Sequence, residues 1–270
     1  MNSQTFLKNC LEEAAKIANE NFGKVSGTIK ESDNNQVLTE TDLAIGKFLV
    51  NKVKETYPDY NIIDEEAGVV DNGSDFTWVI DPIDGTSNFA NGVPTYGIMM
   101  GLLEKETPIA GGIALPFFNQ IAIAEKGKGT FINGERVFVT EEKHLINTLV
   151  SYGIDGHQEN PQMTKDELQI LERIILGIRN LRTSNSAFDN IMVATGKYGG
   201  FVNQSCKIWD NVAPDIITKE AGGVYTDFWG KPMDYSDPLT KTNQIYTFCS
   251  ASPELHKQLQ EIIYATDGKT

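Results

Sequence analysis

Two aspartates, separated by a proline and an isoleucine, close an apolar stretch of the sequence. The segment WVIDPIDGTSNF (residues 78–89) begins with three apolar residues that indicate the end of a buried strand. Because Pro82 has no amide hydrogen and cannot continue a hydrogen-bonded ladder, we expect this strand to finish at Asp81. Asp81 and Asp84 would then lie at the carboxyl end of a strand, where open sheets flanked by helices usually bind ligands.

The residues after Asp84 are suited to bind an anion. Gly85 permits a tight turn, and the amides of Gly85, Thr86 and Ser87 can open a helix N-terminus, which attracts anions. The segment thus offers ligands for a cation and donors for an anion within one turn, as a metal-bound phosphate requires. By itself, however, Asp-Pro-Ile-Asp-Gly is also ordinary turn chemistry, in which aspartate side chains bind the backbone.

Acids elsewhere in the chain occupy comparable positions. Glu65 and Glu66 follow a short apolar stretch in IIDEEAG, and Asp210 follows an isoleucine and a tryptophan at the expected start of a helix. Taken singly, a Glu-Glu pair is typical of a solvated face, and an aspartate at a helix start is typical of an N-cap. Each observation therefore has a structural explanation as well as a functional one.

A common site would favour the functional explanation. If folding brings Glu65, Asp81, Asp84 and Asp210 together, their mutual repulsion raises their pKa values or pushes them apart. A divalent cation removes this repulsion, and ligands that are all oxygen favour Mg²⁺ over zinc or copper. The acids therefore predict a Mg²⁺ site if the fold brings them together.

Two helices and a series of strands are expected in the first half of the chain. Apolar residues recur at helical spacing over residues 3–22 and again over 42–57, where Thr39 or Thr41 provides an N-cap. Between these helices the polar run SGTIKESDNNQ indicates a mobile loop. Strand patterns follow up to about residue 139, and Asn-Gly between TFI and RVFV indicates a hairpin.

The pattern changes near residue 140, after which strands and helices alternate. The strands LVSYG, GGFVNQ, GGVYTDF and IYTFCSAS are expected beside helices over 163–179, 186–195, 210–221 and from Pro253 onward. This shift predicts a strand-rich sub-domain over residues 1–140, which holds most of the acids, and an alternating sub-domain over 141–270, which holds Asp210. We expect the two to share a continuous interface and to form one catalytic unit.

Composition and charge exclude several function classes. The 270 residues carry 23 basic and 37 acidic side chains, a net charge of −14, and no basic stripe, so direct nucleic-acid binding is not expected. No apolar run approaches the roughly 20 residues that a membrane span needs. The first residues lack the basic region of a signal peptide, and the three widely spaced cysteines suit reduced thiols, so a cytoplasmic location is expected.

Together these motifs resemble the inositol monophosphatase family. The resemblance rests on Glu65-Glu66, on DPIDGTSNF from Asp81, on Trp209-Asp210-x-x-Ala213, and on Glu-Ala-Gly-Gly from Glu220. It runs in order over nearly the whole chain. Members are Mg²⁺-dependent, lithium-sensitive phosphatases related to fructose-1,6-bisphosphatase. The resemblance implies an α+β fold, a layered αβαβα sandwich with the site between its layers, and a homodimer.

The resemblance also implies roles for individual residues. One metal ion would bind Glu65, Asp81 and the carbonyl of Ile83, and a second would bind Asp81, Asp84 and Asp210. Asp42 with Thr86 would orient and deprotonate the attacking water. The amides of Gly85 and Thr86 would hold the phosphate, and Ser186 and Ala187 would contact the alcohol portion of the substrate.

The chemistry of phosphate esters agrees with this assignment. Hydrolysis of a phosphate monoester is very slow without a catalyst, so the site must supply large electrostatic stabilisation. Two metal ions can activate a water and stabilise the leaving alkoxide in an in-line displacement, and no phosphoenzyme is then required. The sequence places no histidine to form one: His144, His157 and His256 stand in unrelated contexts.

The chain departs from the family pattern where the alcohol portion binds. Asn185 replaces a glycine, and Asn203, or Gln204 if the alignment is shifted by one, replaces an acid that contacts inositol. An amide in place of a carboxylate weakens one hydrogen bond to a sugar hydroxyl. We rank inositol 1-phosphate first among substrates. The 2′-phosphate of NADP(H) and fructose 1,6-bisphosphate follow, with dual specificity open. Ser87, where bisphosphate nucleotidases commonly carry lysine, disfavours that branch.

A second class of function stays open. Some bacterial relatives engage the transcription machinery, so the chain is alternatively a regulatory interaction protein with an incidental phosphatase site. The negative charge argues against direct contact with RNA but not against a protein partner. The intact set of acids argues for catalysis.

Overall fold

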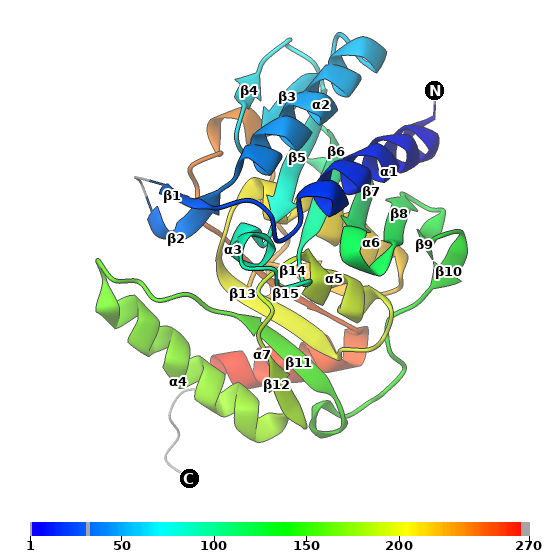
Figure 1. Cartoon of the computed structure of the whole chain (residues 1–270). Helices are drawn as coiled ribbons and strands as arrows, with labels where there is room; N and C mark the ends of the chain where they lie inside the picture. Colours follow the sequence, from blue (N-terminus) through cyan, green and yellow to red (C-terminus); the bar gives the residue numbers. More distant parts are fainter. Residues whose placement is uncertain (1, 31–32, 266–270) are drawn as a thin grey trace.

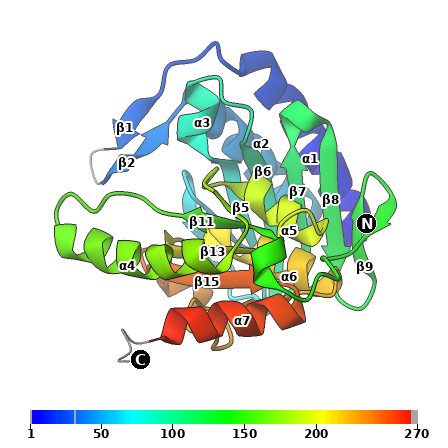
Figure 2. The ribbon, with the colours of Figure 1, turned by 90° about the horizontal axis from the view of Figure 1, so that it is seen from below.

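The computed structural model describes residues 2–30 and 33–265 as five stacked layers. Helices α1 and α2 cover one face of a large sheet, α5 and α6 lie between this sheet and a second one, and α4 and α7 cover the outer face of the second sheet (Figures 1 and 2). The expected α+β fold with αβαβα layering is therefore confirmed.

In the described residues the large sheet has eight strands, in the order β10-β9-β8-β7-β6-β5-β3-β4. Its neighbours are antiparallel except for β3 and β5, which run parallel. The strands are β3 (Asn61–Asp64), β4 (Gly68–Val70), β5 (Phe76–Asp84), β6 (Gly97–Glu104), β7 (Thr107–Leu115), β8 (Gln120–Glu125), β9 (Gly129–Ile132) and β10 (Glu135–Val137). The Asn-Gly turn joins β9 to β10 as an antiparallel hairpin, as predicted.

The second sheet has five strands within the described part of the chain, in the order β12-β11-β13-β15-β14. Strands β12, β11 and β13 are parallel, and β15 is antiparallel to both of its neighbours. The strands are β11 (Leu149–Gly153), β12 (Asn180–Arg182), β13 (Gly200–Cys206), β14 (Val224–Thr226) and β15 (Tyr246–Ala251). The strands of the large sheet precede residue 140, and those of the second sheet follow it. The division of the chain into two sub-domains is still a prediction.

The helices follow the predicted apolar patterns closely. They are α1 (Ser3–Asn21), α2 (Glu40–Thr56), α3 (Thr86–Ala90), α4 (Pro161–Gly177), α5 (Ala187–Ala194), α6 (Val212–Glu220) and α7 (Pro253–Tyr264), with short 3₁₀ turns η1 (Pro116–Phe118), η2 (Leu145–Asn147), η3 (Ile208–Asp210) and η4 (Pro238–Thr240). Because α5 and α6 are covered by a sheet on each side, most of their residues are buried. This central layer brings the two sheets, and the acids they hold, to one region.

Two local predictions were wrong. The polar run after α1 is not a mobile loop: β1 (Thr28–Lys30) and β2 (Asp33–Leu38) pair antiparallel, although residues 31–32 lie outside the described residues. Strand β5 does not finish at Asp81 but continues to Asp84. The pairing with β6 shifts register between Asp81 and Asp84, so Pro82 lies in an irregular step where no ladder amide is needed.

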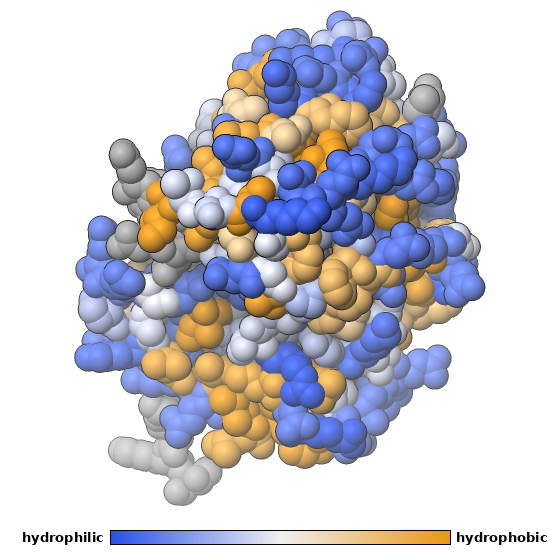
Figure 3. Space-filling model, in the orientation of Figure 1, coloured by the Kyte–Doolittle hydropathy of each residue, from blue (hydrophilic) through white to orange (hydrophobic). Residues whose placement is uncertain are grey.

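The surface and the thiols show little that is unusual. Hydrophilic residues cover much of the face in Figure 3, and hydrophobic residues gather on its lower part. Among the large hydrophobic side chains of α4, Leu168 and Leu176 are exposed. The three cysteines are buried and reduced. No helix in residues 2–30 and 33–265 has the length and apolar character needed to cross a membrane.

Candidate active site

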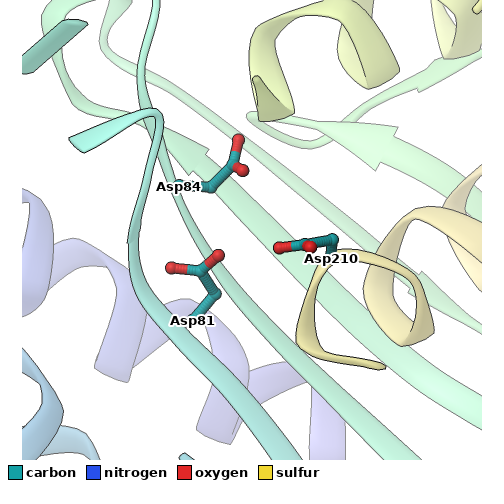
Figure 4. A group of neighbouring side chains, drawn as sticks. All are labelled: Asp81, Asp84 and Asp210. Atoms are coloured by element: carbon teal, nitrogen blue, oxygen red, sulfur yellow. The ribbon is translucent and has the colours of Figure 1, made fainter. Parts of the chain in front are cut away.

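Three aspartates from distant parts of the sequence meet at the end of β5. Asp81 and Asp84 lie in the last part of β5, and Asp210 lies in the 3₁₀ turn η3 that follows β13 (Figure 4). One carboxylate oxygen from each lies within 4.8 Å of the other two. Asp210, which lies more than 120 positions from the other two aspartates in the sequence, thus joins them in one acidic cluster. The metal site expected from the sequence depended on such a convergence.

Burial and like charge act on this cluster together. Burial raises the pKa of Asp81 well above its usual range, and the charges of Glu65, Asp84 and Asp210 raise it further. The pKa of Asp84 is likewise raised, first by burial and then by Asp210. Asp81 is 1% exposed, and its Oδ1 has no hydrogen-bond partner among the described residues. An unpaired buried carboxylate oxygen among like charges fits a cation.

Backbone amides hold two of the three carboxylates. The N–H of Ala187, at the start of α5, donates to Asp84 Oδ2, and the N–H of Lys207 donates to Asp210 Oδ2 at 2.5 Å. Asp210 therefore caps the η3 turn, and Asn211 is the N-cap of α6. The helix was expected to begin at Asp210, and it begins at Val212. Ala187 is fully buried, and its N–H contacts Asp84.

Glu65 and Ile83 complete the set of residues expected to bind metal. Glu65 directly follows β3, and its N–H donates to the carbonyl of Ile80 at 3.2 Å, which fixes it beside β5. The carbonyl of Ile83 accepts a hydrogen bond of 2.8 Å from Thr86 Oγ1. Both residues line the same cavity as the three aspartates.

A hydroxyl and a carboxylate lie beside the acidic cluster. Thr86 Oγ1 donates to Asp42 Oδ1 at 3.0 Å across 44 positions of sequence. Asp42 Oδ2 accepts from the N–H of Thr39, at 2.9 Å, and from its hydroxyl, so Thr39 is the N-cap of α2 and forms a capping box. Burial raises the pKa of Asp42, and the hydrogen bonds from Thr39 and Thr86 oppose this rise.

Gly85 allows a close approach between α3 and the loop before α5. Its φ is +81°, in the left-handed region, and a Cβ there would lie 2.9 Å from the Cβ of Ser186 and 3.2 Å from the carbonyl of Thr95. The side chain of Asn88 donates to the carbonyl of Ser184 at 3.0 Å and links the same two segments. A glycine is therefore required at this position.

These groups open into one cavity of about 780 Å³ between the sheets. Its walls include the expected residues Glu65, Asp81, Ile83, Asp84, Gly85, Thr86, Ser186, Asn203 and Asp210. Asp42 and Ala187 are not part of the wall: Asp42 reaches it through Thr86, and Ala187 through Asp84.

The side chains of Asn203 and Gln204 on β13 differ in their surroundings. Asn203 lines the cavity, whereas the amide of Gln204 donates to the hydroxyl of Tyr152 at 2.6 Å and lies outside the cavity wall. Of the two amides, Asn203 is therefore the one that a ligand can meet.

Sequence reasoning missed several cavity residues. Asp155 and His157, in the segment between β11 and α4, and Lys207, before η3, line the cavity. His157 is thus not in an unrelated context, although no catalytic role follows from its place. A polar Asp-Gly-His segment, one residue after the strand LVSYG, was the available signal, since ligands collect at strand ends in such sheets.

The arrangement can perform metal-assisted hydrolysis. A buried acidic cluster can hold a cation, and a hydroxyl hydrogen-bonded to a carboxylate can orient and deprotonate a water beside it. The cavity has room for a small molecule next to both groups.

Comparison with known proteins agrees with this chemistry. The sequence model of the inositol monophosphatase family matches residues 3–265. The chain is 32% identical over 246 residues to a fructose-1,6-bisphosphatase/inositol-1-monophosphatase of Aquifex aeolicus, covering 87% of this chain and 92% of the relative. It is 32% identical to the Nus factor SuhB of Pasteurella multocida over 198 residues, 73% of each chain. An IMPase of Thermotoga maritima superposes with a TM-score of 0.85 at 29% identity over 97% of both chains.

Proposed function

Since this chain belongs to the inositol monophosphatase family and is a phosphatase of phosphate monoesters, we propose that it hydrolyses inositol 1-phosphate to inositol and phosphate. The observation that supports this most is the convergence of Asp81, Asp84 and Asp210 beside the Asp42–Thr86 pair in one cavity. This convergence provides both a cation site and a group that can take a proton from water.

We propose Mg²⁺ as the cofactor. The donor set consists of oxygen atoms, which suits a hard cation, and the unpaired Oδ1 of Asp81 gives the cluster a reason to bind one. Glu65, Asp81 and the Ile83 carbonyl would hold one ion, and Asp81, Asp84 and Asp210 a second. When bound, Mg²⁺ supplies Lewis acidity toward the phosphate and lowers the pKa of a bound water.

The residues around the metal site position the reactants. Thr86 Oγ1 orients the attacking water, and Asp42 Oδ1, 3.0 Å from it, receives the proton that passes through the hydroxyl. The raised pKa of Asp42 makes its carboxylate a stronger base than an exposed one. The amides of Gly85 and Thr86 hold the phosphate oxygens, and Ser186 and Asn203 contact the alcohol portion.

The charges of the cavity favour a monophosphate with a neutral alcohol. Six carboxylates of the described wall face it, those of Glu65, Asp81, Asp84, Asp155, Glu159 and Asp210. Among the described wall residues, Lys207 is the one with a permanent positive charge, and its ammonium donates to the carbonyl of Asn243 at 3.0 Å. A second phosphate, as in fructose 1,6-bisphosphate, would therefore find few cations. Of the two substrates ranked behind inositol 1-phosphate, we place fructose 1,6-bisphosphate second, because the Aquifex relative is named for both activities, and NADP(H) third.

The test is a comparison of kcat/KM with Mg²⁺ for inositol 1-phosphate, fructose 1,6-bisphosphate and NADP. We expect inositol 1-phosphate to give the highest value. A higher value for either of the others would replace the proposed substrate, and a loss of activity on chelation that Mg²⁺ restores would support the cofactor.

A regulatory role is the alternative of another class. It is favoured by the similarity to a relative named as a Nus factor, while the net charge of −14 argues against direct contact with RNA. A chain that lacks phosphatase activity toward all three substrates, yet binds a protein partner, would support this alternative.

Four further expectations are proposals. We propose a homodimer and inhibition by lithium on the basis of the family, a cytoplasmic location on the basis of the cysteines and the first residues, and the two sub-domains 1–140 and 141–270 on the basis of the change in pattern between them. Light scattering of the purified protein measures the first of these, and an assay with added Li⁺ measures the second.

A further inference from the structure

Two buried polar side chains at the start of α5 belong to the cavity wall and lack hydrogen-bond partners. Ser186, the N-cap of α5, is 4% exposed, and Asn190, one turn further along, is 3% exposed. Within the described part of the chain, neither Ser186 Oγ nor Asn190 Oδ1 has a hydrogen-bond partner. A buried polar atom without a partner is unfavourable, so two such atoms on one wall indicate a ligand that pairs with them.

The spacing of these two side chains lets them bind one group together. Ser186 and Asn190 are four residues apart, and residues four apart on a helix share a face, with Cβ atoms about 5–6 Å apart. An oxygen atom that forms hydrogen bonds of ordinary length to two side chains bridges about 5.5 Å between them. A single oxygen atom of a ligand can therefore contact both residues.

Ser186 lies directly beside the turn that is expected to hold the phosphate. A Cβ at Gly85 would lie 2.9 Å from Ser186 Cβ, and the next residue, Ala187, donates its N–H to Asp84 Oδ2. The pair thus begins at the phosphate turn and continues along α5 to Asn190. A ligand group bound by this pair would belong to the alcohol that carries the phosphate.

The surroundings of Asn190 are apolar. Helix α5 packs against β6, β13 and β15, and from these strands Met99, Phe201 and Phe248 line the same cavity. Each of the three is at most 2% exposed, and all belong to one hydrophobic cluster, in which the two phenylalanine rings are 4.9 Å apart. An amide is not needed for packing against such residues, because an apolar side chain of similar volume would serve as well.

The two unpartnered groups complement a hydroxyl group. Asn190 Oδ1 is a hydrogen-bond acceptor, and the hydroxyl of Ser186 can donate a hydrogen bond. A ligand hydroxyl can donate to the first and accept from the second. A carboxylate or a phosphate dianion has no proton to give to Asn190, and an ammonium group has no acceptor for Ser186.

We propose that Ser186 and Asn190 together bind one hydroxyl group of the alcohol portion, which makes Asn190 a residue that selects polyhydroxylated alcohols over apolar ones. The inference rests on the proposed phosphatase function. The ligand hydroxyl donates to Asn190 Oδ1 and accepts from Ser186 Oγ, and neither residue takes part in bond breaking. Met99, Phe201 and Phe248 form the apolar floor beneath this hydroxyl.

The experiment compares two substrates in four variants. Inositol 1-phosphate carries hydroxyl groups on its alcohol portion, and p-nitrophenyl phosphate carries none. The variants are Asn190→Leu, which keeps the size of the side chain but removes its hydrogen bonds, Ser186→Ala, and the double variant. Met192→Leu is the matched control, because Met192 is a buried residue of α5 that is not part of the described cavity wall. The readouts are the ratio of kcat/KM for the two substrates and the melting temperature.

We expect Asn190→Leu to lower the ratio of inositol 1-phosphate to p-nitrophenyl phosphate about fivefold or more, mostly through KM, since a buried hydroxyl would lose its acceptor. The double variant should lie within about twofold of the lower single, because both residues bind the same hydroxyl. Asn190→Leu should melt at or above the temperature of the parent, since it removes an unpaired buried acceptor. Ser186→Ala should melt lower, since it removes the N-cap of α5.

The outcomes separate this inference from the proposed function. A ratio that Asn190→Leu leaves unchanged, or lowers no more than Met192→Leu does, would overturn the role of Asn190. So would equal losses on both substrates with a lower melting temperature, because Asn190 would then be structural. Multiplicative losses in the double variant would overturn the shared hydroxyl. In each of these cases the phosphatase function stands, whereas a parent protein that hydrolyses neither substrate with Mg²⁺ would overturn both.

Discussion

The hydrogen bond between Thr86 and Asp42 gives the sharpest test of the proposed mechanism. The perturbation is a double-mutant cycle of Thr86→Ala and Asp42→Asn. The threonine hydroxyl has one proton, which it can give to Asp42 Oδ1 at 3.0 Å or to the Ile83 carbonyl at 2.8 Å. If the two side chains act on one water as a unit, removal of either should disable the same step.

The magnitude follows from the chemistry of the pair. General base catalysis typically contributes about 10²–10⁴ in rate, so each single variant should lose at least about 100-fold in kcat. Two independent losses of 100-fold would multiply to about 10⁴. A pair that acts as a unit should instead leave the double variant within about threefold of the poorer single, a coupling of about 2–2.7 kcal/mol.

The assay must separate catalysis from folding, because Asp42 also belongs to the capping box of α2. Thr39→Ala removes the cap and leaves the Thr86–Asp42 bond, so it should lower stability by about 0.5–2 kcal/mol. Its kcat should fall less than tenfold. The measurements are kcat with saturating substrate and Mg²⁺, and thermal unfolding of each variant.

Multiplicative losses in the double variant would refute the relay. Thr86 would then grip the phosphate and Asp42 would act separately, with the metal site unaffected. A loss in Thr39→Ala as large as that in Asp42→Asn would refute the reasoning in another way, because helix capping would then explain the effect.

Two further predictions concern the acidic cluster. Asp84→Asn should keep the hydrogen bond from Ala187 through its amide oxygen but lower metal-dependent turnover by orders of magnitude, and kcat within about threefold of the parent would show that Asp84 only forms the turn. Because the folded-state pKa values of Asp81 and Asp84 are raised, these groups favour folding below pH ~4, the usual pKa of aspartate, and this contribution is lost as pH rises through the raised values. Without metal, the melting temperature should therefore fall between pH ~4 and neutral pH. Millimolar Mg²⁺ should raise it most at neutral pH, and a thermal scan at neutral pH that Mg²⁺ leaves unchanged would argue against the cation site.

Local sequence patterns were sufficient to predict most of the helices and strands. The apolar spacing of residues 3–22 predicts α1 because a helix with one buried face needs that period, and α1 spans Ser3–Asn21. The turn after Asp81 and Asp84 could also be predicted from local chemistry, since Gly85 suits a turn with a positive φ. A polar run, by contrast, does not reveal a short strand pair such as β1–β2, whose composition resembles a loop.

The sequence by itself thus determined the residue types of the site and the elements that hold them, because periodicity, capping and turn chemistry act over a few residues. Only the tertiary structure decided which of these residues meet. The packing of two sheets around α5 and α6 brings Asp210 to Asp81 and Asp155 to the cavity, and the pairing irregularities in β5 and β13 accompany the placement of Asp84 and Asn203 on its wall. Such contacts depend on layer packing and strand register, which no short stretch of sequence specifies.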